Sequence, residues 1–232
     1  MFQPAANPDL MPSLGRLVRG LSALFWGLPL ALLACAQSDV FHWFAPYGFL
    51  VPPAATALLW HGANQLAYFQ RQERVWMRAV DVVRTFGGLT FGLSPFLYFW
   101  NRFPSDPFFA QNVGLMAISA LLFMISLNHA LYRLAAMLPD EMLRHENRMF
   151  TAFNAGLLAV LLLVLLGFLA AQQLGRGWVV SYLSRLLPMA LVSLVLLPLA
   201  LTMTLLWKTK ETILHSVFGP QQAGSVGLPS KN

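Results

Sequence analysis

Residues 125–157 read ISLNHALYRLAAMLPDEMLRHENRMFTAFNAGL, and this stretch leaves one apolar run, crosses a charged turn and enters the next apolar run. Residues 58–89, LLWHGANQLAYFQRQERVWMRAVDVVRTFGGL, follow the same pattern. The two stretches agree at an offset of roughly 68 residues, which is the signature of an internal repeat. The matched residues are His61 with His129, Leu66 with Leu134, Ala67 with Ala135, Glu73 with Glu141, Gly88 with Gly156 and, one interval earlier, Gly20 with Gly88 and Arg16 with Arg84. We therefore predict three tandem helical hairpins, at about 16–78, 79–148 and 149–210.

The composition is that of an integral membrane protein. Of the 232 residues, 57% are hydrophobic and 10% are charged, against about 25% charged in an ordinary soluble domain. Several apolar runs approach the roughly 20 residues that a helix needs to cross a bilayer. We expect an all-α, polytopic protein forming a single membrane domain over 1–232, with a disordered tail at 217–232. The six expected transmembrane helices lie at about 21–36, 48–68, 85–100, 109–134, 149–172 and 187–207.

The basic residues predict how the chain is oriented. The net charge is +6, but Lys and Arg lie at the ends of apolar runs and not on a basic face with interleaved aromatics, so nucleic acid is not an expected partner. The expected cytoplasmic side carries Arg16, Arg19, Arg71, Arg74, Arg78, Arg84, Arg133, Arg144, Arg148, Lys208 and Lys210, and the opposite side carries Arg102, Arg176 and Arg185. The positive-inside rule then places both termini in the cytoplasm. We expect a bacterial inner (plasma) membrane.

Small residues suggest where the helices pack. Lipid tails are as apolar as leucine, so helices in a membrane associate through close packing and interhelical hydrogen bonds. Gly20, Gly88 and Gly156 occupy one position of the repeat, and Gly92 follows Gly88 at the spacing of a small-x3-small pattern. We predict that these four glycines are contact points between helices.

Polar side chains within apolar runs are the best indication of a functional site, because they are costly at membrane depth. The second span presents His61, Asn64, Gln65 and Tyr68 on one helical face, and the fourth presents Ser126, His129, Tyr132 and Arg133. These residues predict an intramembrane polar cluster in the cytoplasmic halves of both spans. No Asp, Glu or Lys is clearly placed at the centre of a span, which argues against an ion-coupled pump. A small channel or carrier lined by the two polar faces stays open.

His61 and His129 admit a second interpretation, as the two axial ligands of a haem b in an electron-transfer subunit. This requires the second and fourth spans to lie side by side with both imidazoles directed at one iron. The alternative is that each histidine hydrogen-bonds a neighbouring helix or reaches the interface. Otherwise no cofactor is expected.

The inventory for catalysis is poor. No phosphate-binding loop, nucleophile elbow or zinc signature occurs in the sequence, and the single cysteine, Cys35, excludes an intramolecular disulfide and a cysteine-based zinc site. No metal site or catalytic residue is predicted, and residues 139–148 are expected to form a short interfacial helix. We expect a non-enzymatic subunit or scaffold of a larger membrane assembly, with other membrane or cytoplasmic proteins, or further copies of itself, as partners.

Overall fold

The computed structural model describes residues 10–36, 48–70, 72–137, 141–173 and 177–218, which form helices and short connections. No strand occurs in these ranges, so the prediction of an all-α protein is confirmed. The predicted tail at 217–232 lies almost wholly outside them. The elements are α1 (Leu10–Ala36), η2 (Gly48–Leu50), α2 (Val51–Leu66), α3 (Arg74–Leu93), α4 (Pro95–Arg102), α5 (Pro107–Met137), α6 (Glu141–Gln173) and α7 (Gly177–Phe218).

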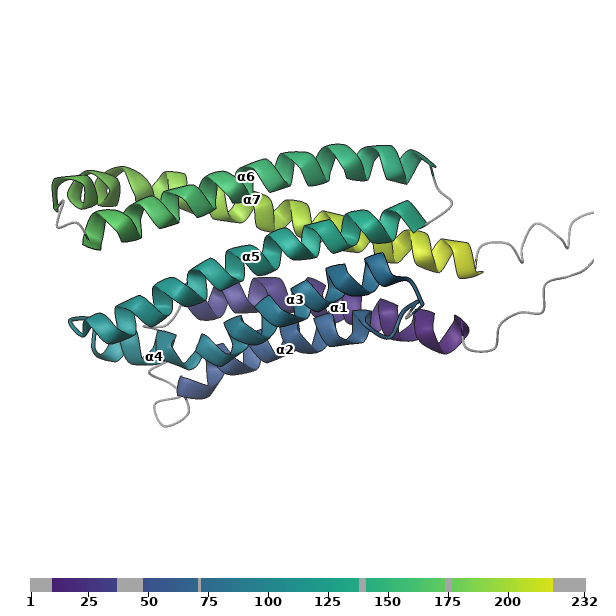
Figure 1. The fold of residues 1–232 in the computed structure, drawn as a ribbon, viewed down its shortest axis with the longest axis horizontal. Coiled ribbons are helices and arrows are strands. Elements are labelled where there is room, and N and C mark those ends of the chain that lie inside the picture. Colours follow the sequence, from purple (N-terminus) through teal and green to yellow (C-terminus); the bar gives the residue numbers. More distant parts are fainter. Residues whose placement is uncertain (1–9, 37–47, 71, 138–140, 174–176, 219–232) are drawn as a thin grey trace, which may run out of the picture.

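The long helices form an elongated bundle in which each helix packs on the next along the chain (Figure 1). The order of neighbours is α1, α2, α3, α5, α6 and α7, and α7 packs back against α1. This last contact closes the series into a ring. A smaller contact between α5 and α7 crosses the ring.

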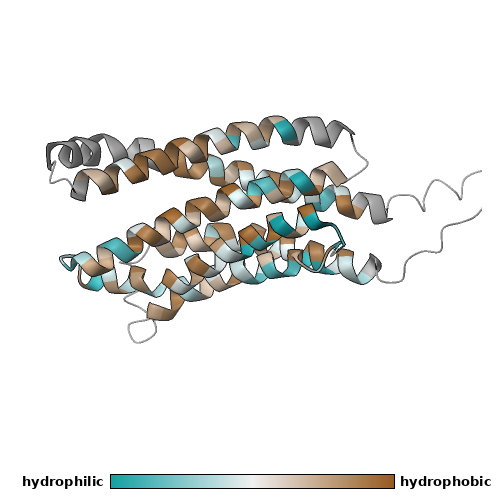
Figure 2. Cartoon of the chain, in the orientation of Figure 1, coloured by the Kyte–Doolittle hydropathy of each residue, from teal (hydrophilic) through white to brown (hydrophobic). Residues whose placement is uncertain are grey.

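The two ends of the bundle differ in chemistry. The end that contains the α2–α3 turn, the beginning of α1 and the last turns of α7, here called the basic end, gathers most of the hydrophilic residues in Figure 2. The opposite end, here called the aromatic end, contains α4 and the start of α5. There the Phe109 ring contacts the rings of Phe96, Phe99, Phe103 and Phe108. Among the described residues, three segments are long and apolar enough to cross a membrane: Pro12–Cys35, Pro107–Met137 and Arg148–Ala171. The structure thus supports a membrane protein.

The start of α3 corrects a predicted boundary. The sequence pattern predicts a charged turn between the second and third expected spans, but α3 already begins at Arg74. Trp76, Val80 and Val83 are buried at helical spacing, while Arg74, Arg78 and Asp81 are exposed. The segment is therefore an amphipathic helix, because its apolar residues recur on one face.

A buried tryptophan anchors the turn between α2 and α3. The indole Nε1 of Trp76 donates a hydrogen bond to the Phe69 carbonyl at 2.9 Å, and the two rings meet edge to face. Gln70, the residue after Phe69, has φ of 40°, in the left-handed region that residues other than glycine rarely adopt. The buried Trp76 side chain therefore determines the shape of this turn more than the backbone preference of Gln70 does.

The glycines predicted to be packing contacts divide into two groups. A Cβ added to Gly20 would approach α2 closely, and one added to Gly88 would meet the Trp60 indole at 3.4 Å. Gly92 and Gly156 have open space where a Cβ would stand, so their prediction as contact points needs correction. Gly20, Gly88 and Gly156 occupy one position of the repeat but have different surroundings, because α1, α3 and α6 pack against different helices.

Candidate functional site

The predicted polar face of α2 lies toward α1 and α3. Arg84 of α3 donates from Nε to Oδ1 of Asn64 at 2.7 Å, and the Arg16 guanidinium of α1 lies 4.7 Å from the centre of the Tyr68 ring. Gln65 Nε2 lies 3.3 Å from His61 Nε2, and the His61 side chain is exposed. These contacts tie the basic end of α2 to its two neighbours.

The residues of the predicted polar face of α5 differ in how far they are buried. Ser126 is buried and its hydroxyl donates to the Phe123 carbonyl at 2.9 Å, within its own helix. His129 is exposed and lines a groove between α3 and α5 together with Ser126 and Arg78. Tyr132 is half-buried and Arg133 is exposed.

The structure does not bring the two predicted faces together. Helix α3 occupies the position between α2 and α5, packing extensively on both. A haem held by His61 and His129 requires the second and fourth spans to lie side by side. That placement is wrong, because α3 lies between them. The residues of the predicted cluster fall into two separate groups, one on either side of α3.

Three other polar residues do meet inside the bundle: Asn128 of α5, Asn154 of α6 and Thr202 of α7. Their side chains are at most 1% exposed. Asn154 Nδ2 donates to Asn128 Oδ1 at 3.0 Å and to Thr202 Oγ1 at 2.9 Å. Asn128 Nδ2 donates to Thr202 Oγ1 at 3.1 Å. We call these residues the Asn–Asn–Thr triad, and it joins three helices.

The hydrogen-bonding capacity of the triad is nearly filled from within. Asn128 Nδ2 also donates to the Met124 carbonyl at 2.8 Å, and the Thr202 hydroxyl donates to the Pro198 carbonyl at 2.8 Å. Oδ1 of Asn154 is the exception: it is buried and has no hydrogen-bond partner among the described residues. An amide oxygen can accept two hydrogen bonds, so the triad retains one unused acceptor.

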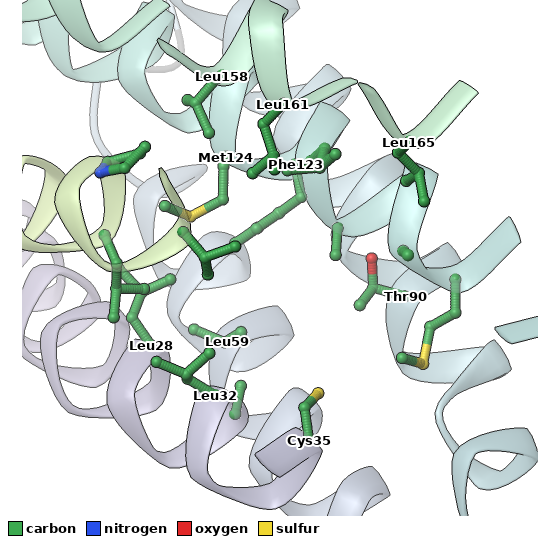
Figure 3. A pocket seen from close by; sticks show the side chains of 18 of the residues that line it. Leu28, Leu32, Cys35, Leu59, Thr90, Phe123, Met124, Leu158, Leu161 and Leu165 are labelled. Carbon is green, nitrogen blue, oxygen red and sulfur yellow. The ribbon is translucent and has the colours of Figure 1, made fainter. Parts of the chain in front are cut away.

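A cavity of about 350 Å³ lies inside the ring, between the triad and the aromatic end. Every long helix contributes to its wall (Figure 3). The lining is almost entirely apolar, with representative side chains Leu28, Leu59, Phe123, Met124, Leu158 and Leu161. Its size is in the range of small-molecule sites.

The triad forms the next layer toward the basic end. Met124, Leu158 and Pro198 line the cavity, and each lies four residues from a triad member on its own helix, that is, about one helical turn away. The triad, a polar layer that joins three helices, therefore lies next to an apolar space whose wall comes from six helices.

Sequence reasoning missed Asn128 and Asn154 although both occur in the stretch that reveals the repeat. Shifting them by the repeat interval gives Trp60 and Phe86, so neither residue has a polar counterpart. The repeat directed attention to equivalent positions instead. The available signal was an asparagine within an apolar run on each of two consecutive helices.

The described residues include no group of three or more His, Cys, Asp or Glu side chains placed to hold a metal ion. No protein family, curated protein or solved structure matches the chain.

Proposed function

We propose that the protein is a non-enzymatic, membrane-embedded subunit or scaffold of a larger assembly. The observation that carries this is the hydrogen bonding inside the bundle, where most buried polar groups of the described residues bond to one another or to their own helices. The triad joins α5, α6 and α7, and the hydroxyls of Thr90 and Ser119 lie 3.1 Å apart between α3 and α5. Such bonds hold helices together in a membrane.

The same observation weighs against the channel or carrier alternative. A path for a polar solute needs free donors and acceptors along it. The cavity inside the ring has an apolar lining instead, and the predicted polar faces of α2 and α5 are separated by α3.

The proposed architecture is three hairpins with six spans in a bacterial inner membrane, with both termini in the cytoplasm. Support comes from the helix order and from the position of the α1 start and the α7 end at the basic end (Figure 1). In a Cys35→Ser background, a cysteine at Gln72 should react with a membrane-impermeant maleimide only after the membrane is opened. A cysteine at Ser105 should react in intact cells. The reverse pattern contradicts the orientation.

The partner is proposed to dock at the basic end, where Arg74 and Arg78 are exposed on α3. Cross-linking in native membranes, followed by mass spectrometry, tests this. The Arg74→Ala, Arg78→Ala double variant should lose a cross-linked partner that the wild type captures. Arg102→Ala, which removes an exposed arginine at the aromatic end, serves as the matched control. A monodisperse, partner-free protein that moves a solute across liposomes would overturn the scaffold proposal.

A further inference from the structure

We propose that the cavity inside the helix ring is a binding site for one hydrocarbon chain of a lipid. The inference goes beyond the scaffold proposal and rests on it only for the location in a membrane. Four wall residues belong to α1: Leu28, Ala31, Leu32 and Cys35. The remainder come from the other five long helices of the ring (Figure 3), and the space is partly open, since its wall residue Cys35 is exposed.

The chemistry of the wall selects the occupant. Thr56 and Thr90 are its hydroxyl-bearing residues, and both hydroxyls are engaged, Thr56 with the Pro52 carbonyl at 2.9 Å and Thr90 with the Phe86 carbonyl at 2.8 Å. Water needs two to four polar partners to be held in a cavity. The wall offers no free set of this kind, so water and polar solutes are disfavoured and a hydrocarbon is favoured.

The cavity lies at a depth where lipid acyl chains surround the protein. Its α1, α5 and α6 wall residues lie within the three segments that are long and apolar enough to cross a membrane. In a bilayer the medium outside those helices is acyl chain. A space of about 350 Å³ left empty would deprive its lining of van der Waals partners. A chain entering from the bilayer restores these contacts without desolvating any polar group.

The triad explains why the chain would stop where the cavity ends. Asn128, Asn154 and Thr202 close the bundle one turn beyond Met124, Leu158 and Pro198. A hydrocarbon that penetrated further would have to displace interhelical hydrogen bonds. The bound segment is therefore limited to the cavity between this layer and the aromatic end.

The test uses the full chain in lipid nanodiscs that contain phosphatidylcholine with a diazirine on one acyl chain. After irradiation, peptide mapping should find adducts on wall residues such as Leu32, Met116 and Met124. Ala120→Phe places a ring in the cavity and should reduce these adducts at least five-fold. Ala159→Phe adds the same ring on an exposed position of α6 and should leave them unchanged. A parallel sample with diazirine-labelled palmitic acid distinguishes a free fatty acid from a bilayer phospholipid as the source of the chain.

A second measurement protects the test against a misfolded variant. Native mass spectrometry of the wild type, after exchange into detergent, should retain one lipid per chain, and Ala117→Phe should lose it. Adducts confined to exposed residues, or wall adducts of equal yield in Ala120→Phe and Ala159→Phe, would overturn the proposal. So would wild-type protein that carries no lipid and shows no wall adducts.

Discussion

Gly20 of α1 and Gly62 of α2 face each other so closely that each excludes a side chain on the other. A Cβ built on Gly20 would lie 3.0 Å from the Gly62 carbonyl oxygen, and one built on Gly62 would lie 3.0 Å from the Gly20 carbonyl oxygen. The relationship is reciprocal and involves backbone atoms, which cannot rotate away. It marks a close approach of the backbones of the first two helices.

Gly62→Ala is therefore expected to destabilise the protein. In a helix interior, alanine is favoured over glycine by up to about 1 kcal/mol. The added methyl group would also meet Leu24 Cγ at 2.8 Å, and such overpacking costs about 1–3 kcal/mol. The second effect outweighs the first, and the midpoint of thermal unfolding in detergent should fall. Gly92→Ala is the control, because open space surrounds that position and its midpoint should stay or rise. A midpoint for Gly62→Ala equal to that of Gly92→Ala would contradict the close approach.

Trp76→Phe tests how the α2–α3 turn is held. The substitution keeps an aromatic ring but leaves the Phe69 carbonyl without the 2.9 Å bond from the indole. An unpaired buried acceptor costs about 1–3 kcal/mol, so urea unfolding followed by circular dichroism should show a loss in this range. Trp26→Phe, at a side chain that is 64% exposed, should change the stability little. Equal effects from both variants would mean that the indole bond does not anchor the turn.

The two histidines give a prediction that separates the sequence-based haem hypothesis from the observed packing. Because His61 and His129 are exposed and α3 separates their helices, we expect protein purified from haem-supplied cells to have the same visible absorption spectrum as the His61→Ala, His129→Ala double variant. The thermal midpoint should also be unchanged. A Soret band that both substitutions abolish would restore the haem hypothesis.

The sequence predicts the helical class well. A helix that crosses a membrane needs an apolar run of a certain length whichever helices it contacts, so composition and run length reveal it. It places α5 nearly correctly. It assigns the start of α3 to a turn, because the arginines in this segment make it polar on average although Trp76, Val80 and Val83 form a buried face. Neighbour relations are a different matter. The sequence predicts that His61 and His129 meet because they lie at equal depth. Equal depth does not make two helices neighbours, and α3 lies between α2 and α5. Asn128 and Asn154 become a pair only when α5 and α6 are seen to face each other.

Asn128 and Asn154 also provide the sharpest energetic test. Their side chains share a 3.0 Å bond, and both donate to Thr202. A double-mutant cycle with Asn128→Ala and Asn154→Ala should therefore show non-additive losses of stability. In membrane proteins such coupling averages about 0.6 kcal/mol and reaches about 1.7 kcal/mol, and unfolding in a mixed-micelle titration measures it.

Asn154→Asp should cost more than Asn154→Ala, because it replaces the only donating group of Asn154 by a second acceptor. The aspartate oxygen would then face Asn128 Oδ1 and the Thr202 hydroxyl oxygen, whose proton is already directed to the Pro198 carbonyl at 2.8 Å. Alanine merely removes the bonds, whereas aspartate adds repulsion and the desolvation of a charge. Thr204→Val is the control, since Thr204 is exposed and bonds only its own helix through the Ala200 carbonyl. If Asn154→Asp were the milder of the two substitutions, Nδ2 of Asn154 would not be the atom that faces its partners, and the unused acceptor would be misassigned.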